Sequence, residues 1–151
     1  MNNEITVTKI IPATIQEIFP YFIESKKIEQ WSAPEGMTLK VPVFEAKEGG
    51  KYRYEHTGAK GVYVCEGHIE KLIPNQKIKM VDEFIKDPEG KEMKNLVGEV
   101  TFMKTGNGTK VTVNQSGFTE VADAKDCEMG WTSCLNQLAN IVGGQEMKRA
   151  G

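Results

Sequence analysis

Apolar and polar residues alternate along much of the chain up to position 118, which is the two-residue period of β-strands with one buried face. Groups of turn-forming residues, such as Gly49-Gly50 and Gly106-Asn107-Gly108, separate the alternating segments. Because the connections from position 37 onward are short, successive strands there are expected to be antiparallel neighbours. The expected strands are residues 4–11, 37–47, 51–56, 62–73, 77–85, 94–104 and 109–118.

The segment between the first two strands has a different character. Residues 14–23 and 24–31 predict two short helices. Pro12 ends the preceding strand, and Pro20 is expected to kink or break the first helix. Ser25 is a weak candidate for capping the second helix.

The C-terminal part of the chain follows a helical period. From Asp123 the apolar residues recur every three or four positions, which predicts one long amphipathic helix that Gly143-Gly144 would end. Its apolar face comprises Cys127, Trp131, Cys134, Leu135, Leu138, Ile141 and Val142. Such a face must cover an apolar surface, and a sheet is the only large one expected. The sequence therefore predicts an α+β protein with a curved, seven-stranded antiparallel sheet around a long C-terminal helix.

Alternation also assigns the faces of the strands and brings one row of inward positions together. Counting outward from the hairpin turns places Tyr52, Gly67, Asp82, Gly98 and Gln115 side by side across the sheet. Glycine in a strand leaves room and permits a bend, so the row predicts a hollow beneath the helix. The other residues expected to face inward are Tyr54, His56, Ile78, Met80, Phe84, Leu96, Val100, Phe102, Val111, Val113 and Gly117.

Composition adds limits on the class of protein. The 151 residues fit one domain with its core at about positions 4–142. The 19 basic and 21 acidic residues give a formal net charge of −2, which argues against a nucleic-acid or acidic-membrane partner. No apolar run approaches the roughly 20 residues that span a bilayer, and no secretion signal is evident at the N-terminus. Three cysteines without metal-type spacing favour a reducing cytoplasm.

Six groups of residues have an order and a spacing that are similar to one known family. They are Ile10-Ile11-Pro12-Ala13 with Ile18-Phe19, Ile28-Glu29-Gln30-Trp31 with Pro34 and Gly36, Glu48 through Tyr54, Gly67 through Pro74, Gly108 through Val113, and Gly130-Trp131 with Leu135 and Leu138. Together they resemble the activator-of-heat-shock-protein-90-ATPase homologues. This family belongs to the START-like, or SRPBCC, superfamily with a helix-grip fold.

The resemblance implies a pocket between the sheet and residues 123–142. Its lining would include Trp31, Tyr52, Tyr54, Met80, Phe102, Trp131 and Leu135. Many members of the family have paired tryptophans where this chain has Trp31-Ser32, which implies a smaller or more polar pocket mouth. The co-chaperone that names the family also has an N-terminal domain that engages the chaperone, and no segment of this chain corresponds to it.

Asp82 and Gln115 complete the set of candidate ligand-binding residues, because the predicted row turns both toward the pocket. An apolar pocket would raise the pKa of the Asp82 carboxyl. Asp82 could then orient a ligand hydroxyl or act as a general base, unless solvent, Gln115 or Tyr52 satisfies it.

Other residues with functional chemistry have structural alternatives. Trp31 and Trp131 are either platforms for a ligand or parts of the core. His56 and His68 are expected on opposite faces of the sheet, without further ligands at suitable spacing. No metal, cofactor or catalytic residue is therefore assigned.

Three functions are compatible with these observations. The first is the binding of a hydrophobic small molecule, such as a lipid, an isoprenoid or a polyketide-like aromatic. The second is a protein-interaction module that acts on a heat-shock chaperone or in a stress response. The third is an enzyme of the cyclase or hydrolase type that uses Asp82 and His56. Because a fold does not fix a function, enzymatic activity stays open and ranks below binding.

Overall fold

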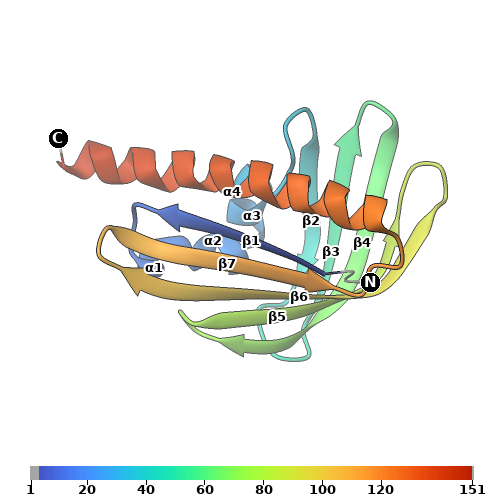
Figure 1. Cartoon of the computed structure of the whole chain (residues 1–151), viewed down its shortest axis with the longest axis horizontal. Coiled ribbons are helices and arrows are strands. Elements are labelled where there is room, and N and C mark those ends of the chain that lie inside the picture. The colour runs from blue at the N-terminus through green and yellow to red at the C-terminus, as the bar shows by residue number, and fades with distance from the viewer. Residues whose placement is uncertain (1–3, 151) are drawn as a thin grey trace.

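The computed structural model describes the backbone of residues 4–150 and the side chains of residues 4–143. In this part of the chain, one strand, three short helices, six strands and one long helix follow each other (Figure 1). The strands are β1 (Glu4–Ile11), β2 (Thr38–Phe44), β3 (Lys51–Gly58), β4 (Gly61–Ile73), β5 (Lys77–Lys86), β6 (Glu92–Thr105) and β7 (Gly108–Ser116). The helices are α1 (Ile15–Ile18), α2 (Pro20–Ile23), α3 (Ser25–Trp31) and α4 (Val121–Ala150).

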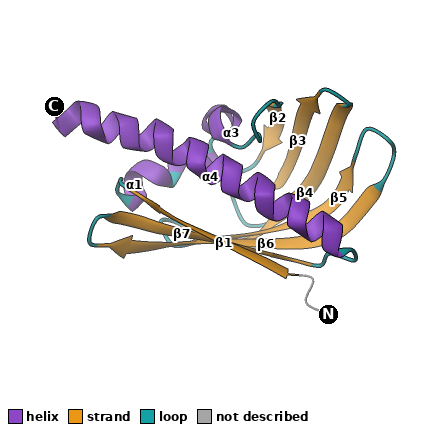
Figure 2. Ribbon diagram, turned by 45° about the horizontal axis from the view of Figure 1, so that its top comes forward, coloured by secondary structure: helices purple, strands orange, loops and turns teal. Residues whose placement is uncertain are grey.

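The strands form one antiparallel sheet in the order β1-β7-β6-β5-β4-β3-β2. Strands β2 to β7 are therefore a meander, and β1 pairs with the last strand rather than with the next one. The short helices lead the chain from β1 to β2 at the far edge of the sheet. Figure 2 shows α4 lying across the concave side, with β1, β7 and β6 beneath it and β2 to β4 rising beside it. This is the helix-grip fold that the sequence predicts.

The C-terminal half of α4 packs into a dense aromatic and aliphatic core. Leu135 and Leu138 on α4 are fully buried. The ring centroid of Phe22 lies 4.7 Å from that of Trp31 and 5.1 Å from that of Phe102. The Trp31 indole donates a hydrogen bond from Nε1 to the Tyr21 carbonyl, at 2.8 Å. One end of the space between helix and sheet is therefore filled by the short helices.

A second cluster supports the first turns of α4 at the opposite end. It contains Ile5, Leu96, Phe118 and Ala124, which are all buried. Trp131 packs against both clusters and stays partly exposed, so it marks the region between them. Within the described residues, no helix combines the length and the apolar character that crossing a membrane requires.

The ends of the helices differ from expectation. Helix α4 begins at Val121 and continues through Gly143-Gly144 to Ala150. Each helical glycine costs about 1 kcal/mol relative to alanine, and the strong helix formers in residues 145–150 offset this cost. Gly143 also permits close packing, because a Cβ atom there would lie 3.2 Å from Cγ of Pro12.

The segment between β1 and β2 contains three short helices instead of two. Pro20 breaks the first expected helix completely, so that α2 begins at Pro20 as a separate turn. Ser25 does not cap α3, because Glu24 occupies the N-cap position without a side-chain hydrogen bond. A side-chain cap is found at α1, where the Thr14 hydroxyl accepts a hydrogen bond from the Glu17 backbone N–H at 3.2 Å.

An irregularity in β5 reverses the expected orientation of Phe84. Glu66 pairs with Phe84 whereas Gly67 pairs with Asp82, so Glu83 is an extra residue in β5. Asn95, on the neighbouring strand, has a φ of 56° at the same level. Beyond this bulge the alternation is shifted by one residue, and Phe84 faces away from the helix. Ile85 and Met93 take the inward positions instead and pack against the second cluster.

The expected row of inward residues is divided into two parts. Tyr52, Gly67 and Asp82 are register partners, and so are Gly98 and Gln115. Gly98 pairs with Met80 rather than with Asp82, because the β5–β6 hairpin is centred on Glu89, one residue earlier than expected. A two-residue offset keeps both parts on the same face, so Gln115 is a diagonal neighbour of Asp82.

Docking of α4 on the sheet predicts unequal effects of substitution on its two faces. Leu138→Ala should lower the free energy of unfolding by about 2–5 kcal/mol, because it leaves a cavity in the dense core. Asn136→Ala, on the exposed face of the same helix, should change it by less than about 0.5 kcal/mol. Urea unfolding followed by circular dichroism measures both values. Equal effects of the two substitutions would contradict the docking of α4.

Candidate functional site

A hydrogen bond between Tyr52 and Asp82 crosses the strand that lies between them. The Tyr52 hydroxyl donates to Oδ1 of Asp82 at 2.6 Å, and Gly67 on β4 separates the two residues in register. A Cβ atom at Gly67 would overlap the Val81 carbonyl oxygen and lie 2.5 Å from the Tyr52 hydroxyl oxygen. The absent side chain of Gly67 is therefore what lets the Tyr52 ring pass over β4 to reach Asp82.

Gln115 and Trp131 extend this contact to the helix. The Trp131 indole on α4 donates from Nε1 to Oε1 of Gln115 at 3.1 Å. This orientation turns the amide nitrogen of Gln115 toward Asp82, whose Oδ2 accepts a long hydrogen bond at 3.4 Å. Tyr52, Asp82, Gln115 and Trp131 therefore form one polar chain from β3 through β5 and β7 to α4.

Asp82 is a half-buried carboxyl whose partners are neutral. Loss of solvent raises the pKa of this carboxyl, and hydrogen bonds from Tyr52 and Cys65 partly oppose the rise. Among the described side chains, no Lys, Arg or His forms an ion pair or a hydrogen bond with Asp82. Burial and the neighbouring Asp82 also raise the pKa values of the Tyr52 hydroxyl and the Cys65 thiol, which therefore remain protonated donors.

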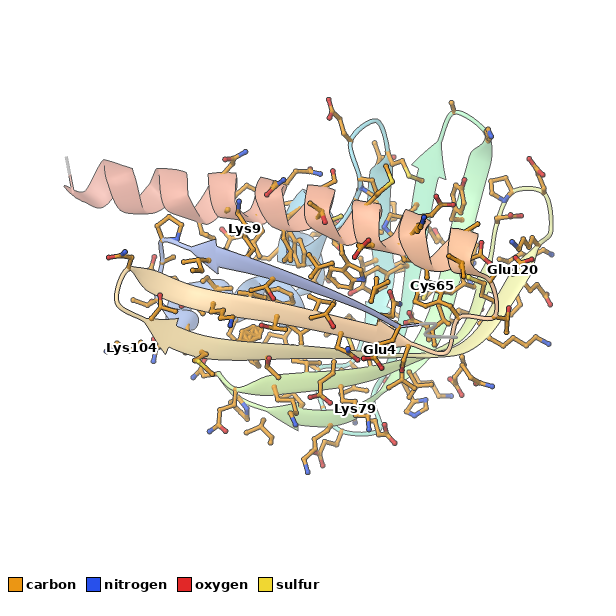
Figure 3. The ribbon with its side chains drawn as sticks, in the orientation of Figure 1. Glu4, Lys9, Cys65, Lys79, Lys104 and Glu120 are labelled. Carbon is orange, nitrogen blue, oxygen red and sulfur yellow. The ribbon has the colours of Figure 1, made fainter. Side chains whose placement is uncertain are left out.

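Open space adjoins the polar chain. Gly98 alternates with the buried residues Leu96 and Val100, so its missing side chain would point toward α4. A Cβ atom built at Gly98 has no heavy atom within 4 Å. Several inward side chains of the sheet keep partly exposed surface although they face the helix: Tyr54, Cys65, Met80, Asp82, Ile85 and Met93. On α4, Cys127 and Trp131 are also partly exposed. Figure 3 shows Cys65 on the helix side of the sheet and Lys79 on the opposite side.

Tyr54 adds a second polar group to this region. Its ring centroid lies 5.6 Å from that of Tyr52 and 6.2 Å from that of His56. Its hydroxyl has no hydrogen-bond partner among the described residues, and burial raises its pKa. His56 lies 2.7 Å from the Ser32 carbonyl through Nε2, and burial lowers the pKa of its ring, so a neutral imidazole donates to this carbonyl.

The structure divides the nine candidate binding residues into two groups. Trp31, Phe102 and Leu135 belong to the dense core and are 2%, 7% and 1% exposed. They hold Trp131 in place, because the Trp31 and Trp131 rings lie 6.4 Å apart. The other six lie outside this core: Met80 and Gln115 are the register partners of Gly98, Tyr52, Asp82 and Trp131 belong to the polar chain with Gln115, and Tyr54 lies beside Tyr52.

Sequence reasoning missed several residues of this region. Cys65 lies two positions before Gly67 on β4, so strand alternation could have placed it inward. Ile85 and Met93 turn inward only because of the bulge at Glu83, which the alternating pattern does not reveal. Cys127 was expected to lie in the core, but it is partly exposed at this space.

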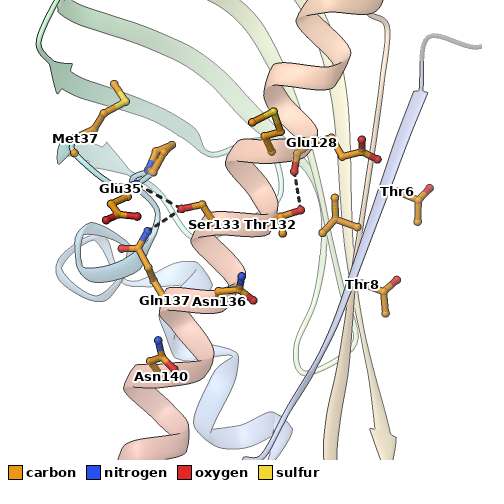
Figure 4. A pocket seen from close by; sticks show the side chains of 14 residues that line it. Thr6, Thr8, Glu35, Met37, Glu128, Thr132, Ser133, Asn136, Gln137 and Asn140 are labelled. Atoms are coloured by element: carbon orange, nitrogen blue, oxygen red, sulfur yellow. Dashed lines mark hydrogen bonds between the residues drawn. The ribbon is translucent and has the colours of Figure 1, made fainter.

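A separate cavity of about 1050 Å³ lies over the outer side of α4. It is bounded by β1, by the loop of residues 34–37 and by polar side chains of α4 (Figure 4). Gln137 in its wall donates to the Ala33 carbonyl at 2.8 Å, and Ser133 accepts from the Glu35 N–H at 3.4 Å. We call this cavity the outer groove. It is open and lined by both polar and apolar groups, and it differs from the predicted pocket between helix and sheet.

Comparisons with solved structures support the helix-grip fold. A protein from Chromobacterium violaceum superposes with a TM-score of 0.80 at 22% identity, covering 92% of this chain and 96% of that chain. A protein from Nitrosomonas europaea gives 0.78 at 13% identity, with 95% and 96% coverage. The AHSA1 protein from Silicibacter pomeroyi gives 0.75 at 17% identity, with 94% and 99% coverage. Identities this low establish the fold alone.

A comparison with curated proteins found no match to this chain. The family model described as "Activator of Hsp90 ATPase homolog 1-like protein" matches residues 12–143. This match runs from the end of β1 through the described side chains of α4, and it includes every residue of the polar chain. The chain therefore belongs to the Activator of Hsp90 ATPase homolog 1-like protein family.

Proposed function

We propose that this protein binds an apolar small molecule in the space between the first half of α4 and strands β3 to β6. The observation that supports this most directly is the open surrounding of Gly98 on the inward face of β6. Met80, the register partner of Gly98, keeps exposed surface on this inward face, and so do Ile85 and Met93 farther along the same two strands. A ligand would remove this surface from water at a gain of about 25 cal/mol per Å².

The polar groups of the region fit a role in orienting the ligand. Binding sites for small molecules are mostly apolar and contain a few convergent polar groups. Here those groups are the Asp82 carboxyl and the unpaired Tyr54 hydroxyl. A lipid, an isoprenoid or an aromatic polyketide would each match an apolar wall with two such groups.

The cysteines of the region do not favour a catalytic role. Burial raises the pKa of Cys127 to about 11 and moves that of Cys65 well above its usual value. Both thiols are therefore protonated at neutral pH, whereas a nucleophilic cysteine needs a thiolate. The cysteines are free, which supports a reducing compartment such as the cytoplasm.

Binding of a heat-shock chaperone is a second proposal, which the description of the family suggests. The outer groove is an open surface that such a partner could contact.

Filling the space should weaken ligand binding without unfolding the protein. Gly98→Val places two methyl groups where a ligand would lie, and valine suits a β-strand. In a thermal-shift screen of lipids, isoprenoids and aromatic compounds, we expect a hit to raise the Tm of the wild type and to lose at least tenfold in affinity for Gly98→Val. Gly106→Val is the matched control, because Gly106 also has open surroundings but lies in an exposed turn. A screen without any hit, or equal binding by both variants, would count against the proposal.

The buried carboxyl predicts a characteristic dependence of stability on pH. The folded protein holds the Asp82 proton more tightly than the unfolded chain, because burial raises the pKa of the carboxyl. Its contribution is therefore greatest below the unfolded pKa and is lost as pH rises through the folded pKa. Tyr52, Tyr54, Cys65 and Cys127 face Asp82 and stay neutral over this range, since their pKa values are raised.

Asp82→Asn provides the measurement, because it removes this titration and keeps the shape of the side chain. The stability of the wild type relative to Asp82→Asn should fall as pH rises from about 4 toward 7. Urea unfolding of both proteins between pH 3 and pH 8 gives the difference at each pH. A difference that stays constant would show that Asp82 has an ordinary pKa and is exposed to solvent.

A further inference from the structure

The carboxyl of Asp82 has acceptor capacity that the protein leaves weakly used. An ionised carboxylate offers about four acceptor positions. Tyr52 makes a short hydrogen bond to Oδ1, but the amide of Gln115 lies 3.4 Å from Oδ2, and the remaining donor is the Cys65 thiol. Thiols are weak donors. Oδ2 therefore lacks a strong partner among the described side chains.

The interior around Asp82 also lacks a positive charge. The groups that face it are Tyr52 and Tyr54 on β3, Cys65 on β4, Gln115 on β7, and Cys127 and Trp131 on α4, and none of them is cationic. Three cations of the neighbouring strands pair with carboxylates on the opposite face of the sheet. These ion pairs are Arg53–Glu66, Lys77–Glu99 and Lys79–Glu70.

Aromatic rings border the same space. Tyr52 and Tyr54 contact each other edge to face on β3, and Trp131 projects from α4 toward Gln115. Electron-rich ring faces attract organic cations. A carboxylate that has no cationic partner and lies next to several aromatic rings can recognise an ammonium group. It would repel a ligand carboxylate.

We propose that the molecule bound in this space carries a protonated amine on an apolar body and that Asp82 is its counter-ion. This inference rests on the proposed function, because it assumes that the space at Gly98 holds a ligand. The ammonium group donates to Oδ2 of Asp82 and lies against the rings of Tyr54 and Trp131. The apolar body occupies the space at Gly98, next to Met80.

The test uses three compounds with one apolar body and different head groups: 4-phenylbutylamine, 4-phenylbutanol and 4-phenylbutyrate. Calorimetric titration at pH 7 measures the affinity of each compound for the full-length protein. We expect the amine to bind at least tenfold more tightly than the alcohol, and the carboxylate to bind most weakly. Asp82→Asn should remove the preference for the amine, so that the amine and the alcohol bind with similar affinities.

Glu99→Gln is the matched control, because it removes a carboxylate that pairs with Lys77 on the other face of the sheet. This variant should keep the full preference for the amine. The ratio of amine to alcohol affinity in the wild type decides the question alone if Asp82→Asn does not fold.

The outcomes separate the two proposals. Equal or tighter binding of the alcohol, or an amine preference that survives in Asp82→Asn, would overturn the assignment of the amine and leave the apolar cavity standing. Binding of other apolar compounds without binding of 4-phenylbutylamine would have the same meaning. If none of these compounds binds and the wider screen also yields no hit, both the amine and the cavity are wrong.

Discussion

The packing of α4 against the concave face of the sheet is the interaction on which the rest of the structure depends. A straight helix cannot follow a strongly curved sheet along its whole length. The two are therefore in complete contact only where side chains of other elements fill the gap between them. Around Cys134–Val142 of α4 the short helices do so, and Leu138 is sealed among rings such as Phe22 and Phe102. Toward the start of α4, no other described helix covers β3 to β5, and inward side chains such as Tyr54, Cys65 and Ile85 remain partly exposed.

The polar chain of Tyr52, Asp82, Gln115 and Trp131 lies between the closely packed and the open part of the space between α4 and the sheet. A buried carboxyl without a counter-ion costs folding free energy, because its ionised form loses hydration without gaining a charged partner. Tyr52 and Gln115 reduce this cost through hydrogen bonds, and Gly67 makes the shorter of the two geometrically possible. Groups that cost stability in this way are concentrated at functional sites. For this reason Asp82, rather than the outer groove, is the centre of the proposed function.

Local irregularities decided which side chains surround the site. Alternation predicted correctly that Asp82 and Gln115 face inward, but it also placed Phe84 there, and the bulge at Glu83 turns Phe84 outward. The same bulge brings Ile85 inward, so the wall is aliphatic where an aromatic ring was expected. The β5–β6 turn is centred one residue earlier than expected, which makes Gln115 a diagonal rather than a direct partner of Asp82. Only the register shows that Gly98 lies between Met80 and Gln115 rather than between Asp82 and Gln115. The space above Gly98 is open.

The sequence by itself determined the class of fold, because the period of apolar residues is a local property. The strands, the amphipathic stripe from Cys127 to Val142 and the family resemblance could all be identified without coordinates. Tertiary structure alone decided where α4 ends, how the two parts of the inward row are offset, and which aromatic residues are sealed in the core. These features depend on contacts between segments that are far apart in the sequence, such as Gly143 and Pro12. No short window of sequence contains both partners of such a contact.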